Sequence, residues 1–285
     1  MTDELGAHVS SSGGCANVHA RAAEIGAVAL QMFTKQPQRW AEPKVSDEDA
    51  SAFREERARY GVTTVVSHAS YLPNLATPDP QLLARSRAAE VAELRRCNAY
   101  GIDLLVEHPG NATDGDRERG LRQNALAIGE ALEEAGGETI FLLETTAGAG
   151  QVLGSTFEEL ARMLELIPEP ARSRVGVCLD TCHVFAAGYD LVNDYDGVMA
   201  RFGTVIGFEH LKLFHLNDSQ GALGSHRDRH AWIGDGLLGV EPFHRILLDE
   251  RFRHVPKLLE TPKGDDPVAS DRENLRRLRA LRTEG

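Results

Sequence analysis

The sequence predicts an α/β protein whose single sheet closes into a (β/α)8 barrel, the TIM barrel. Short apolar runs alternate with segments of helical pattern along the chain of 285 residues, and eight of each are found. This alternation is typical of parallel strands that are joined by helices. The length also fits, because such a barrel typically needs about 250 residues. We therefore expect residues 1–285 to form one barrel domain.

Most of the eight expected strands are near-continuous apolar runs. A parallel strand that is covered on both faces has this pattern, because both of its faces are buried. In chain order the expected strands are 5–9, 27–33, 63–67, 102–107, 139–143, 175–179, 211–216 and 255–259.

The clearest of the eight expected helices covers residues 80–100. Asp79 suits the N-cap, Pro80 suits the first helical position, and Gly101 ends the segment. The other expected helices are 14–25, 46–60, 116–135, 156–166, 194–207, 240–250 and 271–283. An open doubly wound sheet is the alternative fold, but it usually has fewer strands and a Gly-rich first turn.

Six of the eight strands end in, or close to, a histidine or an acidic residue: His68, His108, Glu144, Asp180, His215 and Glu260. His8 lies at the end of the first strand, and Thr34 and Lys35 follow the second. In a barrel the carboxyl ends of all strands meet at one mouth, where active sites lie. One such residue alone is more often a hydrogen-bonded structural side chain. Six of them at the same mouth indicate a functional site.

Two loops add three residues of the same kind. His183 lies in "CLDTCHVFAAGYD" after the sixth strand, and Asp228 and His230 lie in "GSHRDRH" after the seventh. Residues i and i+2 of an extended chain point to the same side, so Asp228 and His230 can bind one ion together. Nine imidazoles and carboxylates are too many for one ion and suit two or three. They favour zinc, manganese or iron, and clustered ions typically serve the hydrolysis of phosphate esters.

Composition sets further limits. The contents of hydrophobic residues (42%) and charged residues (26%) are ordinary for a globular protein. No apolar run approaches the ~20 residues of a membrane span, and the acidic N-terminus lacks a signal-peptide pattern, so we expect a cytoplasmic protein. The four cysteines match neither a disulfide framework nor a zinc ribbon, and we interpret them as small buried side chains: Cys15, Cys97, Cys178 and Cys182.

Seven motifs together resemble the endonuclease IV family, the metal-dependent apurinic/apyrimidinic endonucleases with a xylose-isomerase-like barrel. They are "GAHVSSSGG" at 6–14, "HASYLPNL" at 68–75, "EHPG" at 107–110, "LETTAGAG" at 143–150, "CLDTCHVFAAGYD" at 178–190, "HLNDSQGALGSHRDRHAWIGDG" at 215–236 and "LETP" at 259–262. The match runs nearly from end to end, and the fifth and sixth motifs are specific together. Thr145 departs from the family, in which an Asn is common at this position.

The resemblance implies three Zn²⁺ ions, with Mn²⁺ or Fe²⁺ as alternatives in part of the sites. Glu144 would bridge the first two ions, and Glu144 and Glu260 are the expected catalytic carboxylates. The implied ligand sets are His68, His108 and Glu144 for the first ion, Glu144, Asp180, His215 and Glu260 for the second, and His183, Asp228 and His230 for the third.

The resemblance also implies that the partner is double-stranded DNA with abasic sites and that the protein acts as a monomer. The family bends DNA and inserts side chains at the lesion, and Tyr71 and Leu72 match the inserting pair. The family often has an inserting arginine in a second loop. In an ungapped alignment its position is occupied here by Gln38, and Arg39 is the next residue. The other expected DNA contacts are His8, Lys35 and Arg229.

The implied activity belongs to base excision repair. Hydrolysis of the phosphodiester 5′ of an abasic nucleotide would leave a 3′-hydroxyl and a 5′-deoxyribose phosphate, and 3′-blocking groups would also be removed. The formal net charge of -12 opposes a polyanionic partner. Three divalent ions would change it to -12 + 6 = -6, and four carboxylate ligands with these ions would carry 6 - 4 = +2. The mouth could therefore attract DNA although the body is acidic.

Two other functions fit parts of the sequence. A sugar isomerase on the same barrel would use fewer metal ligands and would need neither "DRH" nor the loop with Tyr71 and Leu72. A DNA-damage-binding protein without catalysis would be free to lose metal ligands, whereas all nine are present.

Overall fold

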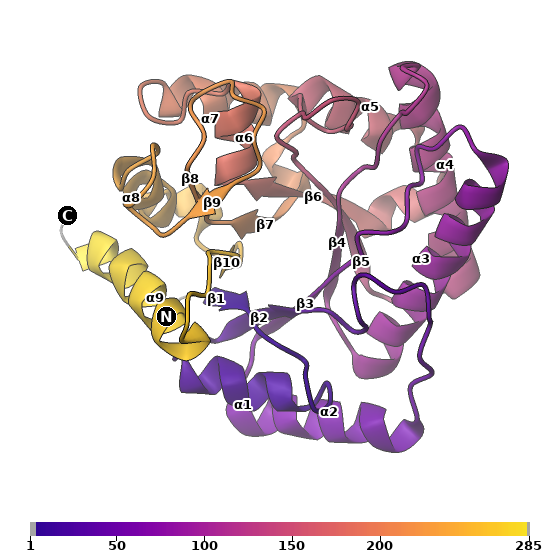
Figure 1. The fold of residues 1–285 in the computed structure, drawn as a ribbon, viewed down its shortest axis with the longest axis horizontal. Helices are drawn as coiled ribbons and strands as arrows, with labels where there is room; N and C mark the ends of the chain where they lie inside the picture. Colours follow the sequence, from indigo (N-terminus) through magenta and orange to yellow (C-terminus); the bar gives the residue numbers. More distant parts are fainter. Residues whose placement is uncertain (1–3, 284–285) are drawn as a thin grey trace.

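Eight parallel strands close into a barrel at the centre of the computed structural model, which describes residues 4–283 (Figure 1). Each barrel strand pairs with the next one along the chain, and the last pairs with the first. The predicted (β/α)8 fold is therefore confirmed. The barrel strands are β1 (Leu5–His8), β2 (Ala29–Met32), β3 (Thr64–His68), β4 (Leu104–Glu107), β5 (Ile140–Glu144), β6 (Val175–Asp180), β7 (Leu211–His215) and β10 (Lys257–Leu259).

Helices surround the barrel on its outside (Figure 1). At the start of α3, the Asp79 carboxylate accepts the backbone N–H groups of Gln81 and Leu82, and Gly101 ends the helix with a positive φ of 74°, as the sequence predicts. The α-helices are α1 (Asn17–Glu24), α2 (Asp47–Tyr60), α3 (Pro80–Tyr100), α4 (Arg117–Ala135), α5 (Phe157–Leu166), α6 (Thr181–Ala187), α7 (Tyr195–Val205), α8 (Glu241–Leu248) and α9 (Pro267–Thr283). Short 3-10 turns are η1 (Ala171–Arg174), η2 (Phe208–His210) and η3 (Glu250–Phe252).

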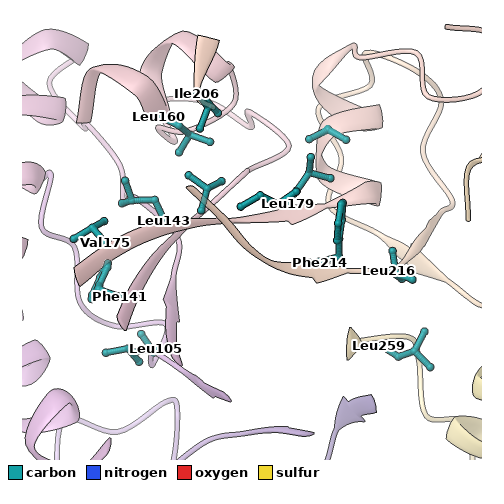
Figure 2. Close-up of a cluster of buried hydrophobic side chains, with 14 of the residues drawn as sticks. Leu105, Phe141, Leu143, Leu160, Val175, Leu179, Ile206, Phe214, Leu216 and Leu259 are labelled. Carbon is teal, nitrogen blue, oxygen red and sulfur yellow. The ribbon is translucent and has the colours of Figure 1, made fainter. Parts of the chain in front are cut away.

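The barrel wall separates two hydrophobic cores. Strand residues that point outward pack against the helices, and Figure 2 shows part of this outer core, with Phe141, Leu143 and Phe214 among the labelled side chains. Successive strand residues point to opposite sides of the wall. The inner core is therefore built from the alternate positions: Ala29, Val66, Leu104, Val106, Leu142, Cys178, Leu213 and Leu258.

Two elements at the mouth are not expected from the sequence. The seven-residue helix α6 follows β6 directly, and β8 (Asp218–Ser219) and β9 (His230–Ala231) form a two-stranded antiparallel ribbon. The bounds of other elements differ slightly: β2 ends at Met32 rather than at residue 33, and α9 begins at Pro267 rather than at residue 271. Among the helices of residues 4–283, none has the length and apolar character that crossing a membrane requires.

Candidate metal centre

Six side chains with metal-binding groups point from the barrel strands into the mouth. Each stands two positions beyond a residue of the inner core, so it keeps the inward direction. Glu144, for example, follows Leu142 on β5, and Asp180 follows Cys178 on β6. The other four are His68, His108, His215 and Glu260. The structure therefore brings together the strand-end residues that the sequence singles out.

Helix α6 and the β8–β9 ribbon supply the remaining three side chains. Asp180 caps α6, since its Oδ1 accepts the backbone N–H of His183 at 2.8 Å. This bond holds His183 beside the end of β6. His230 begins β9, and Asp228 stands two residues before it. The Asp228 Oδ1 atom lies 3.2 Å from His183 Nε2 and 3.3 Å from His230 Nε2.

The nine side chains fall into three groups, of which the first two share Glu144. Within each group the candidate ligand atoms lie within 4.8 Å of one another. The groups are His68, His108 and Glu144; Glu144, Asp180, His215 and Glu260; and His183, Asp228 and His230. They coincide with the three ligand sets that the sequence resemblance implies, although metal binding by these residues stays a prediction.

Glu144 lies at the centre of the cluster and is fully buried. Its Oε2 atom is 3.3 Å from His68 Nε2 and 3.2 Å from His108 Nε2. Its Oε1 atom is 2.9 Å from His215 Nδ1. The two oxygens therefore face different groups, which is the arrangement that a bridging carboxylate needs.

Three histidines are held by their outer ring nitrogen. The Nδ1 atoms of His68, His183 and His230 lie 2.8, 2.8 and 3.2 Å from backbone carbonyl oxygens, to which they donate. With the proton on Nδ1, the Nε2 atom of each ring has a lone pair that points into the cluster. Histidine ligands of metal ions are commonly oriented in this way.

Several inward atoms of the cluster have no hydrogen-bond partner. Among the described residues these include Glu144 Oε2, His183 Nε2 and His230 Nε2, all of them buried. Nitrogen and oxygen lone pairs that face one another repel, and a buried polar atom without a partner is costly. A divalent ion between them removes both problems, and the mixed imidazole and carboxylate donors fit such an ion.

The two glutamates of the cluster, Glu144 and Glu260, are ionised. Burial acts to raise the pKa of Glu144, but His215 and His108 outweigh burial and hold this pKa well below its usual value. Burial likewise opposes ionisation of Glu260, yet His215 brings its pKa down to about 2. At the edge of the mouth, burial lowers the pKa of His8 to about 3, so this imidazole is neutral at pH 7. The cluster is thus rich in negative charge, which metal ions would compensate.

Two neighbours outside the set of candidate ligands restrain Asp180 and Glu260. The Asn217 amide donates to Asp180 Oδ2 at 2.7 Å, and its oxygen accepts the backbone N–H of Glu260 at 2.8 Å. The Thr145 hydroxyl accepts the backbone N–H of Asp180 at 2.9 Å. The only sequence signal for Asn217 is its place in "HLND", next to a candidate ligand.

The carboxylate of Asp218 binds the backbone at the far end of the same motif, "IGDG" at 233–236. It accepts the backbone N–H groups of Gly234, Gly236 and Leu238 at 2.9 to 3.0 Å. A Cβ atom on Gly236 would lie 2.4 Å from Asp218 Oδ1, so only glycine fits there. "IGDG" is therefore a structural motif that closes the loop after the β8–β9 ribbon.

Except for His8, which ends β1, the expected DNA-contacting residues lie in loops around the mouth. Tyr71 is 62% exposed, and Leu72 is half-buried beside it in a pocket that also includes His68 and His108. Gln38 and Arg39 are exposed in a turn whose Pro37 carbonyl accepts the backbone N–H of Tyr71 at 3.2 Å. The two loops therefore form one edge of the mouth. Arg229 is exposed on the β8–β9 connection.

Lys35 differs from the other expected DNA contacts. Its side chain is only 4% exposed, and its ammonium group donates to Glu42 at 2.5 Å and to the Arg39 carbonyl at 3.1 Å. The charge points into the loop rather than toward the mouth. Its role in DNA binding stays a prediction, and its contacts give it a part in shaping the loop.

The two cysteines beside the cluster are buried thiols. Burial raises the pKa of both Cys178 and Cys182 to about 12. Each sulfur lies near carboxylate and imidazole groups, and all four cysteines are free. A thiol with such a pKa is protonated at pH 7, which agrees with the interpretation of small buried side chains.

Comparisons with known proteins agree with the geometry. A family model described as a xylose isomerase-like TIM barrel matches residues 19–281. A probable endonuclease 4 of Chloroflexus aggregans is 48% identical over 280 residues, covering 97% of each chain. A probable endonuclease 4 of Trichlorobacter lovleyi is 46% identical over 284 residues, covering 99% of this chain and 100% of the relative.

Solved structures resemble this one over nearly their whole length. The crystal structure of endonuclease IV from Thermus thermophilus has a TM-score of 0.87 at 36% identity and covers 99% of both chains. A D-psicose 3-epimerase of Clostridium cellulolyticum has a TM-score of 0.71 at 16% identity, covering 98% of this chain and 99% of that one. The likeness to the epimerase concerns the fold alone.

Proposed function

The chain belongs to the endonuclease IV family of xylose isomerase-like TIM barrels, and we propose that it incises DNA at abasic sites with the help of three zinc ions. The family membership makes it a phosphodiester hydrolase of DNA repair. The observation that carries the finer proposal is Glu144, whose two oxygens face separate groups of candidate ligands. Zinc suits these donors best, with manganese or iron as alternatives in part of the sites.

The metal ions would supply Lewis acidity and positive charge at the scissile phosphate. The protein's own part is to hold the ligands in place before the substrate arrives. Glu144 sets the spacing of the first two groups, and Asp180 connects the second and third, because it is itself a candidate ligand and caps the helix that carries His183. Asn217 restrains Asp180 and the backbone of Glu260. A rigid site of this kind needs little reorganisation during the reaction.

Specificity for abasic sites would come from DNA deformation. Tyr71 and Leu72 lie on one side of the mouth, with Gln38 and Arg39 in the adjoining turn. A nucleotide without a base has lost its stacking, so moving it out of the duplex costs less than the few kcal/mol for a normal nucleotide. The neutral His8 at the mouth and the exposed Arg229 would contact the backbone.

The proposed bond cleavage lies 5′ of the abasic nucleotide. It leaves a 3′-hydroxyl and a 5′-deoxyribose phosphate, and 3′-blocking groups are removed by hydrolysis of the same class of ester. All nine candidate ligands come from one chain, which supports a monomer as the active form. A cytoplasmic location stays a prediction.

Metal analysis and a nicking assay test the proposal together. Plasma emission analysis of gently purified protein should find close to three transition-metal ions per chain, mostly zinc. The same protein should nick a duplex with one abasic site and leave the matched intact duplex whole. No more than one ion per chain after remetallation would refute the trinuclear site, and sugar isomerisation without nicking would favour the sugar isomerase alternative.

A further inference from the structure

Gln31 lies inside the mouth, among residues that are far from it in sequence. It stands two positions beyond the inner-core residue Ala29 on β2, so it points inward, and it is fully buried. Its side-chain amide contacts three groups from three other strands or strand ends, namely His8, His215 and Glu260. The sequence does not single out Gln31, because it lies inside the expected second strand rather than at its end.

The contacts of Gln31 determine which way its amide points. Gln31 Nε2 lies 2.6 Å from Glu260 Oε1, and Oε1 of Gln31 lies 2.8 Å from His215 Nε2. A carboxylate only accepts hydrogen bonds, so the atom that faces it must be the amide nitrogen. The amide oxygen then faces His215, and the proton of this imidazole must be on Nε2.

The same orientation leaves His215 Nδ1 as the nitrogen that can bind a metal ion. In the neutral imidazole, which is the form that binds metal, Nδ1 has the lone pair, and it lies 2.9 Å from Glu144 Oε1 and 3.3 Å from Glu260 Oε2. Three lone pairs thus converge on one position of the second ligand group. Glu260 uses its two oxygens differently, since Oε1 is held by Gln31 and Oε2 faces this position.

The second amide hydrogen of Gln31 is directed at His8. Gln31 Nε2 lies 3.0 Å from His8 Nδ1, so this nitrogen accepts and the proton of His8 is on Nε2. His8 packs at 4.5 Å, ring to ring, against Phe33, which limits its rotation. One amide therefore determines the protonated nitrogen of two imidazoles and the rotation of one carboxylate.

We propose that Gln31 is a positioning residue of the metal centre. It holds His215 in the tautomer that is protonated on Nε2 and binds a metal ion through Nδ1, and it turns Glu260 Oε2 toward the same ion. This inference rests on the metal centre of the proposed function. Removal of a group that orients a metal ligand typically costs 10- to 100-fold in metal affinity. We therefore expect a loss of about this size at one of the three sites, the one bound by His215 and Glu260.

The first test replaces the amide by an apolar group of similar length. Gln31→Met removes the three hydrogen bonds without opening a large cavity. Gln123→Met is the matched control, because the Gln123 amide on the outer helix α4 donates to the Leu75 and Thr77 carbonyls and not to any candidate metal ligand. In competition with a chromophoric chelator, Gln31→Met should release one of three zinc ions at about 10- to 100-fold lower chelator concentration. Gln123→Met should release zinc as the unchanged protein does.

A second readout follows the protons directly. Histidine labelled with ¹⁵N in the zinc-loaded protein should show His215 and His8 protonated on Nε2, and Gln31→Met should remove this preference at His8. Gln31→Glu separates the two halves of the proposal. A carboxylate still accepts from His215 but cannot donate to Glu260, so the His215 tautomer should persist while one zinc ion is again bound more weakly.

The outcomes distinguish this inference from the function on which it rests. Zinc binding by Gln31→Met and Gln31→Glu that equals that of the unchanged protein would overturn the positioning role alone. A loss equal to that of Gln123→Met would also overturn it. An unchanged protein that binds no transition metal would refute the metal centre and this inference together.

Discussion

At the scale of single residues, the mouth contains carboxylates whose two oxygens contact different partners. Glu144 presents one oxygen to His68 and His108 and the other to His215. Asp180 caps a helix with one oxygen and receives the Asn217 amide on the other. Replacing such a residue changes two neighbours at once, so its effect should exceed that of losing one hydrogen bond.

The Glu144→Gln variant tests this expectation. The amide keeps the shape but loses the charge and one of the two acceptor atoms, so the bridge between the first two groups is lost. Incision of abasic duplex should fall by at least about 100-fold, because even indirect partners of metal ions cost 10- to 100-fold. The melting temperature of the metal-free protein should change little, since barrel stability resides elsewhere. Near-normal incision by this variant would show that Glu144 does not bridge.

A second residue-scale prediction concerns a histidine far from the mouth. His19 on α1 is completely buried, with its ring 4.4 Å from that of Phe53 on α2. Burial lowers the pKa of His19 to about 4 from 6.5. Between these values the unfolded chain takes up a proton that the folded chain refuses, so the free energy of unfolding should fall as the pH drops from about 6.5 to about 4.

Replacing His19 should therefore flatten part of this acid loss. In His19→Leu the difference in the free energy of unfolding between pH 7 and pH 4.5 should be smaller than in the unchanged protein, by at most about 3 kcal/mol. Urea titrations at both pH values give this difference. His254→Leu, at an exposed histidine, is the control and should leave it unchanged. Equal acid losses in all three proteins would mean that His19 is accessible to protons in the folded state.

At the scale of elements, long segments with repeated patterns could be predicted and short ones could not. The barrel strands and α3 follow from apolar runs and from the caps Asp79 and Gly101. Helix α6 has only seven residues and begins where a strand ends, and β8 has only two residues. These segments are too short to show a hydrophobic periodicity in the sequence. They form through contacts with other parts of the mouth. Gln31 was missed for a related reason, because its partners lie 23, 184 and 229 positions away.

The loops around the mouth are anchored from behind by α3. Arg96 on α3 donates to Glu42 at 2.6 Å and to the Thr34 hydroxyl at 3.0 Å, and Lys35 donates to Glu42 as well. These ion pairs are largely buried, so they restrain the loop more than exposed pairs would. The loop that carries Gln38 and Arg39 is thus held in place before DNA binds.

Variants in the loop that carries Tyr71 and Leu72 should distinguish residues that recognise damage from residues that take part in hydrolysis. Tyr71→Ala combined with Leu72→Ala should weaken binding to abasic duplex, while the zinc content stays at three ions. An inserted side chain offsets part of the few kcal/mol that unstacking costs. The loss in kcat/KM should therefore be smaller on a gapped or nicked abasic substrate, which unstacks more easily. Equal losses on intact and gapped duplex would leave Tyr71 only a packing role.

At the scale of the whole molecule, the negative net charge opposes the proposed binding of DNA. The chain has a formal net charge of -12, and three divalent ions would leave it at -6. Long-range attraction of DNA is therefore weak, and binding must depend on local positive groups at the mouth. Arg39 and Arg229 are exposed there, whereas the Lys35 charge is paired with Glu42.

The salt dependence of DNA binding measures which of these charges meet phosphates. Each phosphate contact contributes about -0.9 to the slope of log K against log salt concentration, through release of counterions. Arg229→Ala should therefore reduce the magnitude of the slope by about 1, equally on different sequences around the abasic site. Lys35→Met should weaken binding without changing the slope, because Lys35 acts through the shape of the loop. Arg276→Ala on α9, whose side chain is 68% exposed and paired with Glu273, should change neither the affinity nor the slope.

Fluorescence anisotropy between about 50 and 200 mM salt, with a catalytically inactive protein, gives the slopes of all three variants. A slope reduced by Lys35→Met would place its ammonium group on the DNA backbone after all, and would mean that the pair with Glu42 opens when DNA binds.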